Sequence, residues 1–317
     1  MGFVPFVKRI YQKFFDHAVT STAATLSFYF IFSLFPFLIV LVMLTQYLPL
    51  FAPSMQRILA AGRAVLPPEA MTVIQSHIEG HRSPPKLLTL GVLVTLYSAS
   101  RGVDAVRAAL NLSYDVKESR PFWRTQGLAI LAVVGGALLA LLSVTVAVIG
   151  GDLGYWLSRH LGIAGLYVEA WRWARWPVTA LLTMLMAALG YYALPDVKQD
   201  FKFITPGSVL CTAAALVATW GFSEYAGHFG SYDVAYGSLG GAAILMTWFY
   251  ILGVIYLVGG EINATIEHES PAGKQEGARA PGQAPPPAAE RPSAAPVGAA
   301  HSSDVAERSP GGAAPAP

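Results

Sequence analysis

Long apolar runs alternate with short polar segments along most of this chain. Six runs have about the twenty apolar residues that a helix needs to cross a bilayer. They cover residues 22–48, 87–112, 127–149, 177–194, 204–225 and 238–260. The pattern predicts an all-α, polytopic membrane protein with six transmembrane helices in a domain of residues 22–268.

The two ends of the chain have different patterns. Within residues 1–21, apolar and polar side chains fall on opposite helical faces, which predicts an amphipathic helix lying in the headgroup region. A soluble packing helix would look similar. The apolar face holds Phe6, Val7, Ile10 and Phe14, and the polar face holds Lys8, Arg9, Gln12, Lys13 and Asp16. Residues 269–317 are mainly Ala, Pro, Gly and Ser, which predicts a disordered tail.

Composition supports a membrane protein and gives little support to catalysis. The chain is 54% hydrophobic and 13% charged, with a formal net charge of +2, so nothing indicates nucleic-acid binding. The single cysteine, Cys211, excludes an intramolecular disulfide. The histidines are scattered and no nucleotide-binding or nucleophile motif is present, so we expect no enzyme activity, no metal and no cofactor.

Basic residues near the predicted span ends favour a topology with both termini in the cytoplasm. The segments placed inside by this topology include the N-terminal helix and two short loops. Those loops carry Lys117, Arg120, Arg124, Lys198 and Lys202.

A polar stripe on the second span is the first candidate site. At about 100° per residue its side chains share one face of the helix, and such a face should meet protein or water rather than lipid. The stripe consists of Tyr97, Ser100, Arg101, Asp104, Arg107 and Asn111. Two interpretations stay open: a substrate path, or structural ion pairs such as Arg101 with Asp104.

Two further places are candidates for a gating movement. Pro36 in the first span predicts a kink, which is either static or a gating hinge. Ser33 or a neighbouring helix could donate to the carbonyl that the proline leaves free. A glycine-rich turn at Tyr236, Gly237 and Ser238 precedes the last span and is the second gating candidate.

Glu261 and Asn263 follow the last span, and we expect Glu261 to meet Arg101 or Arg107 across the bundle. Gly135 and Gly136 would permit close helix packing, either within the bundle or in a homo-oligomer.

Several segments resemble the YihY/BrkB family of bacterial inner-membrane proteins, historically misnamed ribonuclease BN. The resemblance covers residues 5–268, and its carriers are AATLSFYFIFSLFPFLIV, SASRGVDAVRAALNLSYDVKESRPFW, LPDVKQDFKFITPGSVL and YGSLGGAAILMTWFYILGVIYLVGGEINA. It implies a multi-pass protein of the inner membrane with cytoplasmic termini and a dispensable tail.

Three functions follow as hypotheses. The first is a transporter or lipid-translocating protein for an anionic envelope substrate such as an anionic lipid, in which Arg101 and Arg107 bind the substrate and Asp104 and Glu261 act as counter-charges. Asn111 and Asn263 would also line the path. The second is a non-transporting scaffold for envelope assembly, and the third is a membrane-bound ribonuclease.

Overall fold

The computed structural model describes residues 2–47, 85–144, 164–228, 238–270, 273–284 and 286–287. Within these ranges the regular structure is entirely helical, as predicted. The helices are α1 (Phe3–Asp16), α2 (Val19–Tyr47), α5 (Pro85–Ser113), α6 (Phe122–Val144), α8 (Ala164–Ala193), α9 (Pro206–His228) and α11 (Ser238–Glu269).

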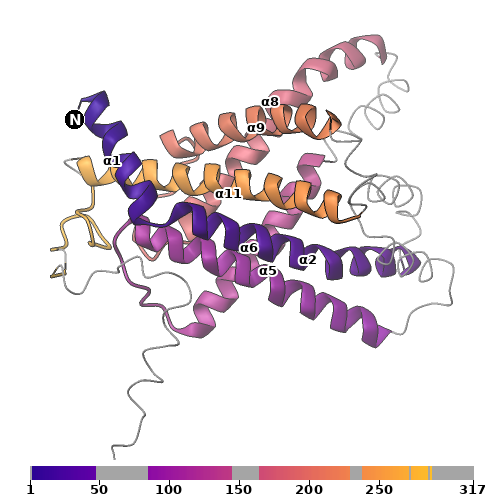
Figure 1. Ribbon diagram of the computed structural model, residues 1–317, viewed down its shortest axis with the longest axis horizontal. Helices are drawn as coiled ribbons and strands as arrows, with labels where there is room; N and C mark the ends of the chain where they lie inside the picture. The colour runs from indigo at the N-terminus through magenta and orange to yellow at the C-terminus, as the bar shows by residue number, and fades with distance from the viewer. Residues whose placement is uncertain are drawn as a thin grey trace, which may run out of the picture.

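The six long helices within these described ranges form a closed ring of neighbours. In order around the ring, α2 packs on α5, α5 on α6, α6 on α8, α8 on α9, α9 on α11, and α11 on α2. Helix α5 also contacts α11, and the short α1 packs on α11 and α2 at one end of the bundle (Figure 1). Two ordered loops, residues 114–121 and 194–205, join neighbouring helices at that same end. We call this the loop end.

The buried core lies toward the loop end. On α6, α8 and α9, every described buried residue is in the half of the helix next to the two loops. The central cluster includes Leu26, Leu110, Tyr191 and Leu257, from four different helices. The Tyr191 hydroxyl donates a hydrogen bond to the Tyr256 carbonyl at 2.7 Å, which satisfies a polar group inside this apolar cluster.

Close approach of α9 and α11 depends on glycine. A Cβ atom at Gly207 would lie 2.1 Å from the Gly259 carbonyl oxygen, so only glycine fits there. The glycines expected to promote packing on α6 behave differently: a Cβ atom at Gly135 or Gly136 would meet nothing within 4 Å among the described residues. Their role in packing within the bundle is therefore not borne out.

The ends of several helices differ from the predicted spans. Helix α8 begins at Ala164 rather than at 177, with Pro177 inside it, because the aromatic and charged residues before the proline also adopt helical conformation. Helix α11 continues past 260 to Glu269, where its polar side chains find protein partners. The N-terminal helix stops at Asp16, since Ala18 takes a positive φ of 48° before α2 begins.

Three helical segments within the described ranges are long and apolar enough to cross a membrane: Phe122–Leu139, Glu169–Ala193 and Ala242–Glu269. Shorter apolar stretches occupy Val19–Leu34 and Pro206–Phe222. Helix α5 is not among these segments, and it carries Arg101, Asp104 and Arg107. The count of six spans therefore stays a prediction.

The predicted tail boundary at 269 lies too early. Residues 273–284 fold back onto the loop end, where Lys274 and Ala278 are buried. The Lys198 amide donates to the Arg279 carbonyl at 2.7 Å, and the Gly277 amide donates to the Tyr114 carbonyl at 3.2 Å. We call residues 273–284 the C-terminal strap. Charged side chains hold the strap in place. The prediction of a disordered tail rested on low apolar content and did not include these charged contacts.

Candidate functional site

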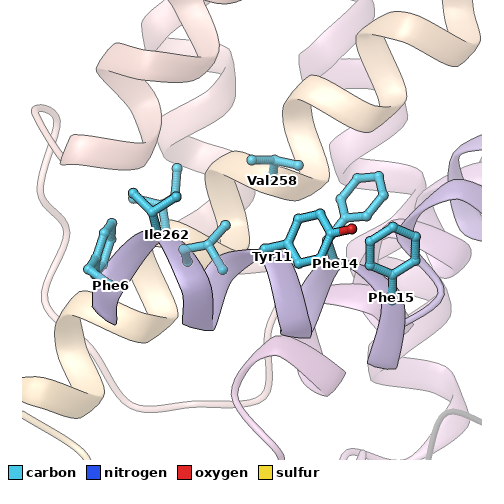
Figure 2. Close-up of a pocket in the computed structure, with 8 residues that line it drawn as sticks. Phe6, Tyr11, Phe14, Phe15, Val258 and Ile262 are labelled. Atoms are coloured by element: carbon cyan, nitrogen blue, oxygen red, sulfur yellow. The ribbon is translucent and has the colours of Figure 1, made fainter. Parts of the chain in front are cut away.

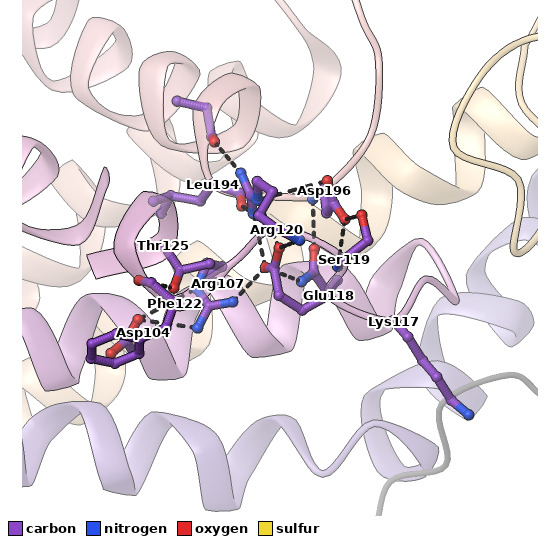
Figure 3. Close-up of polar contacts among 12 residues, drawn as sticks. Asp104, Arg107, Lys117, Glu118, Ser119, Arg120, Phe122, Thr125, Leu194 and Asp196 are labelled. Atoms are coloured by element: carbon purple, nitrogen blue, oxygen red, sulfur yellow. Dashed lines mark hydrogen bonds and ion pairs between the residues drawn. The ribbon is translucent and has the colours of Figure 1, made fainter. Parts of the chain in front are cut away.

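An ion cluster at the loop end joins α5 to both ordered loops (Figure 3). Its members are Asp104, Arg107, Glu118, Arg120 and Asp196. Arg107 pairs with Asp104 at 3.1 Å and also with Glu118, while Arg120 lies 2.7 Å from Glu118 and 3.6 Å from Asp196. Each of these two arginines therefore bridges two carboxylates.

Glu118 is the centre of the ion cluster. Burial by itself would raise the pKa of Glu118, but hydrogen bonds from Arg120, Arg107 and Asn111 outweigh burial and lower the pKa from 4.5 to about 2. The carboxylate is therefore ionised at neutral pH and neutralises both arginines. Arg120 also donates to the Leu194 carbonyl at 2.6 Å, so the cluster closes the open end of α8.

Asn111 ties the ion cluster to the second loop. Its side-chain amide donates to Glu118 at 3.0 Å, and its carbonyl oxygen accepts from the Asp196 amide at 2.7 Å. Asn111 is buried, and the Asp196 carboxylate accepts from the amide and the hydroxyl of Ser119. This geometry gives Asn111 a structural role, and a structural role was one of the two interpretations of the stripe.

The structure divides the predicted polar stripe into two parts. Arg107 and Asn111 point into the ion cluster, but Arg101 lies nine residues before Leu110, which is two and a half helical turns. Leu110 packs next to Gly260 of α11, so Arg101 is on the opposite, outward side of α5. Its side chain is 45% exposed and lies 3.4 Å from Asp104.

The outward face of α5 is otherwise apolar. Leu90, Leu93 and Tyr97 are exposed on it and lead along the helix to Arg101. The neighbouring Ser100 accepts a hydrogen bond from Gln126 of α6 at 3.0 Å. Gln126 is one turn after Phe122 and Trp123, which are both exposed, so Arg101 is near the level of an exposed aromatic pair.

Glu261 does not contact Arg101 or Arg107, contrary to expectation. Its carboxylate lies 2.6 Å from His17 Nδ1 and accepts from the Ser113 hydroxyl at 2.7 Å. Glu261 faces the junction of α1 and α2 because α11 turns this side of the helix toward α1, whereas the arginines lie on other sides of α5. The counter-charge role predicted for Glu261 therefore loses its geometric basis.

The other predicted residues have local roles where the structure describes them. Asn263 accepts from the Gly207 amide at 2.8 Å, which joins α11 to the start of α9. Ser33 donates to the Phe30 carbonyl, so it does not satisfy the carbonyl of Phe32 that Pro36 leaves without its helical donor. Ser238 is the first residue of α11. The Pro36 side chain, Tyr236 and Gly237 lie outside what the structure describes.

Helix α1 turns charged residues toward the protein. Arg9 pairs with Glu269 at 3.5 Å and with Glu276 of the C-terminal strap, and Lys13 lies 3.7 Å from Glu276. His17 continues the same row toward Glu261. These residues are four apart in sequence and so share one face of the helix.

One group of metal-ligand types comes together only in the tertiary structure. Donor atoms of Asp115, His268 and Glu276 all lie within 4.8 Å of one another. The Lys13 ammonium is 4.0 Å from the Asp115 carboxylate and 3.7 Å from that of Glu276. A cationic side chain is thus already placed against both carboxylates, and we assign no metal to the group.

Sequence reasoning missed Glu118, Asp196, Lys274 and Glu276. Glu118 and Asp196 are in loops with alternating charges, and this pattern is also typical of solvent-exposed turns. Lys274 is fully buried against Glu267 and the Tyr114 ring. The sequence did contain one indication of this fold: charged residues continue after residue 269, and a disordered segment of Ala and Pro does not require them.

These features define the class as an all-helical membrane protein with a charged, ordered loop end. The family described as Virulence factor BrkB matches residues 10–284, which includes the C-terminal strap. The chain belongs to this family, and the predicted resemblance is confirmed, with a boundary that extends beyond 268.

Relatives from several bacteria agree with this assignment. The chain is 33% identical to the putative ribonuclease-like protein YfkH of Bacillus subtilis, over 82% of this chain and 94% of the relative. It is 26% identical to a UPF0761 membrane protein of Chromohalobacter salexigens, over 81% of this chain but only 62% of that relative. A UPF0761 membrane protein of Pseudoalteromonas translucida is 25% identical, over 80% of this chain and 83% of the relative. No solved structure matches.

Proposed function

We propose that this protein is a lipid-translocating protein or transporter of the bacterial inner membrane, acting on an anionic envelope lipid. The single observation that carries the proposal is Arg101, an exposed arginine on the outward face of α5. The fork of an arginine side chain binds phosphate oxygens in two parallel hydrogen bonds.

The level of Arg101 fits a lipid phosphate. Exposed aromatic residues gather at membrane interfaces, and Phe122 and Trp123 lie close to the Arg101 level on the adjacent helix. Asp104 contacts Arg101 through one nitrogen and also pairs with Arg107. A phosphate group can therefore replace Asp104 as the partner of Arg101, while Asp104 stays paired with Arg107.

We propose that both termini and the loop end lie in the cytoplasm. Basic residues of the N-terminal helix and of both loops meet at this end, and the positive-inside rule supports this orientation. Arg279 of the C-terminal strap donates to the Lys117 carbonyl at 2.8 Å, which joins the C-terminal side of the chain to the same surface.

A translocation assay tests the proposal. Full-length protein is reconstituted into vesicles with fluorescent phosphatidylglycerol, and dithionite reports how fast label reaches the outer leaflet. We expect Arg101→Ala to slow translocation at least about tenfold, because a hydrogen bond to a charged group is worth about 1.5–3 kcal/mol. Arg101→Lys should retain part of the rate. Leu93→Ala, on the same outward face, is the matched control and should behave as wild type.

A second candidate is a scaffold for envelope assembly, favoured by the rigid, charged loop end. Wild-type vesicles that translocate no faster than protein-free ones would reject the first proposal and favour this one. We do not propose RNA cleavage, although the Bacillus relative is named ribonuclease-like, because Arg107 and Arg120 of the loop end are paired with carboxylates. That the protein is no enzyme remains a prediction.

A further inference from the structure

An open apolar groove runs between α1 and α11. It has a volume of about 400 Å³ and is lined by six side chains of α1 together with Val258 and Ile262 of α11. Figure 2 shows α1 crossing α11, with the rings of Phe6, Phe14 and Phe15 along the helix beside these two aliphatic side chains. A groove of this size is within the range of small-molecule binding sites.

The groove lies along the flank of α1 that meets α11, where Phe14 packs against the buried core and Tyr11 and Phe15 border the open side. Arg9, Lys13 and His17 point inward to carboxylates, while Phe3, Tyr11 and Phe15 are 81%, 65% and 60% exposed. A helix on a water-soluble surface normally buries such large apolar side chains. Because the chain belongs to a family of membrane proteins, the solvent that suits this apolar face is lipid.

The chain beyond residue 287 has few side chains that suit an apolar groove. Residues 288–317 contain Val297 and Val305 as their only large aliphatic side chains, and no aromatic ones. A phospholipid acyl chain supplies a continuous apolar rod that suits this lining, and the exposed Tyr11 and Phe15 border the open side of the groove. We propose that the α1/α11 groove binds one acyl chain of a membrane phospholipid.

Photolabelling tests this site independently of Arg101, which lies on a different helix. Full-length protein is placed in vesicles containing phosphatidylglycerol with a diazirine in one acyl chain, irradiated, digested and mapped by mass spectrometry. We expect label on peptides spanning residues 6–15 and 258–262. Ile262→Trp fills the groove and should reduce this label at least about fivefold, roughly 1 kcal/mol of binding.

The control is Ile266→Trp, one turn further along α11, where the side chain is exposed and does not line the groove. It should leave the labelling unchanged. Val7→Trp fills the groove from the α1 side and guards against misfolding of the Ile262 variant, with thermal unfolding measured for each protein. Unchanged groove label in both filling variants, or crosslinks joining α1 of two protein copies in place of lipid label, would overturn the proposal.

Discussion

At the scale of single residues, Glu118 shows how a loop carboxylate organises its surroundings. Two arginines and Asn111 donate to it, and through them it connects α5, the first loop and the end of α8. Asn111 is buried and both arginines are largely shielded from water, and this reduced contact with water strengthens each interaction.

The low pKa of Glu118 makes a pH prediction. The folded pKa of about 2 is below the unfolded value near 4.5, so the contribution of Glu118 to stability is present above pH 4.5. That contribution is lost as the pH falls from about 4.5 toward 2. We expect Glu118→Gln to be less stable than wild type at pH 7, and the difference in melting temperature to shrink over this window.

Thermal unfolding of the detergent-solubilised protein measures this difference. Asp200→Asn, at an exposed position in the second loop, serves as the control and should show little change at any pH. A constant difference between wild type and Glu118→Gln from pH 7 to pH 3 would contradict the assigned pairing.

At the scale of elements, glycine governs how closely α9 and α11 pack. Gly207 faces the Gly259 carbonyl, and its amide bonds to Asn263, so backbone meets backbone at this crossing. Gly135 of α6 has no such neighbour within the described part of the chain. Both glycines lie in apolar helices, but only Gly207 is required for a close helix crossing.

Alanine substitution separates the two cases. In Gly207→Ala the new Cβ atom would lie 2.1 Å from a carbonyl oxygen and 2.6 Å from Asn263, and overpacking of this kind costs about 1–3 kcal/mol or more. We expect a lower melting temperature and less folded protein in the membrane. Gly135→Ala should be neutral or up to about 1 kcal/mol more stable. Equal behaviour of the two variants would show that the close crossing is absent.

At the scale of the whole molecule, the C-terminal strap closes the loop end. Lys274 is buried with Glu267, Glu276 pairs with Arg9, and Arg279 lies 3.5 Å from Asp196. Burial by itself would raise the pKa of Glu276, but the positive charges of Lys13 and Arg9 outweigh burial and lower the pKa, which keeps Glu276 ionised and attractive to α1. The strap thus links the first helix, the last helix and both loops.

Two truncations test the strap. A chain ending at Pro287 keeps every strap contact made within the described residues and should match the full-length protein in stability and membrane yield. A chain ending at Ser270 leaves Arg9, Lys13 and Glu267 without their partners in the strap. Its free energy of unfolding should fall by at least about 2 kcal/mol, since hydrogen bonds to charged groups contribute about 1.5–3 kcal/mol each. Equal stability of the two truncated chains would show that the strap does not contribute to stability and is part of a dispensable tail.

The sequence by itself determined the helical class, the approximate positions of the long helices and the family, because apolar runs and helical periodicity are local properties of the chain. Only the tertiary structure decided which partners the charged residues take. Arg101 and Arg107 look alike on a helical wheel, yet one faces outward and the other enters the ion cluster. Glu261 meets His17, and Lys274 anchors the strap. The physical reason is that a charge pairs with whatever the fold brings within a few ångströms, and those neighbours lie far away in sequence.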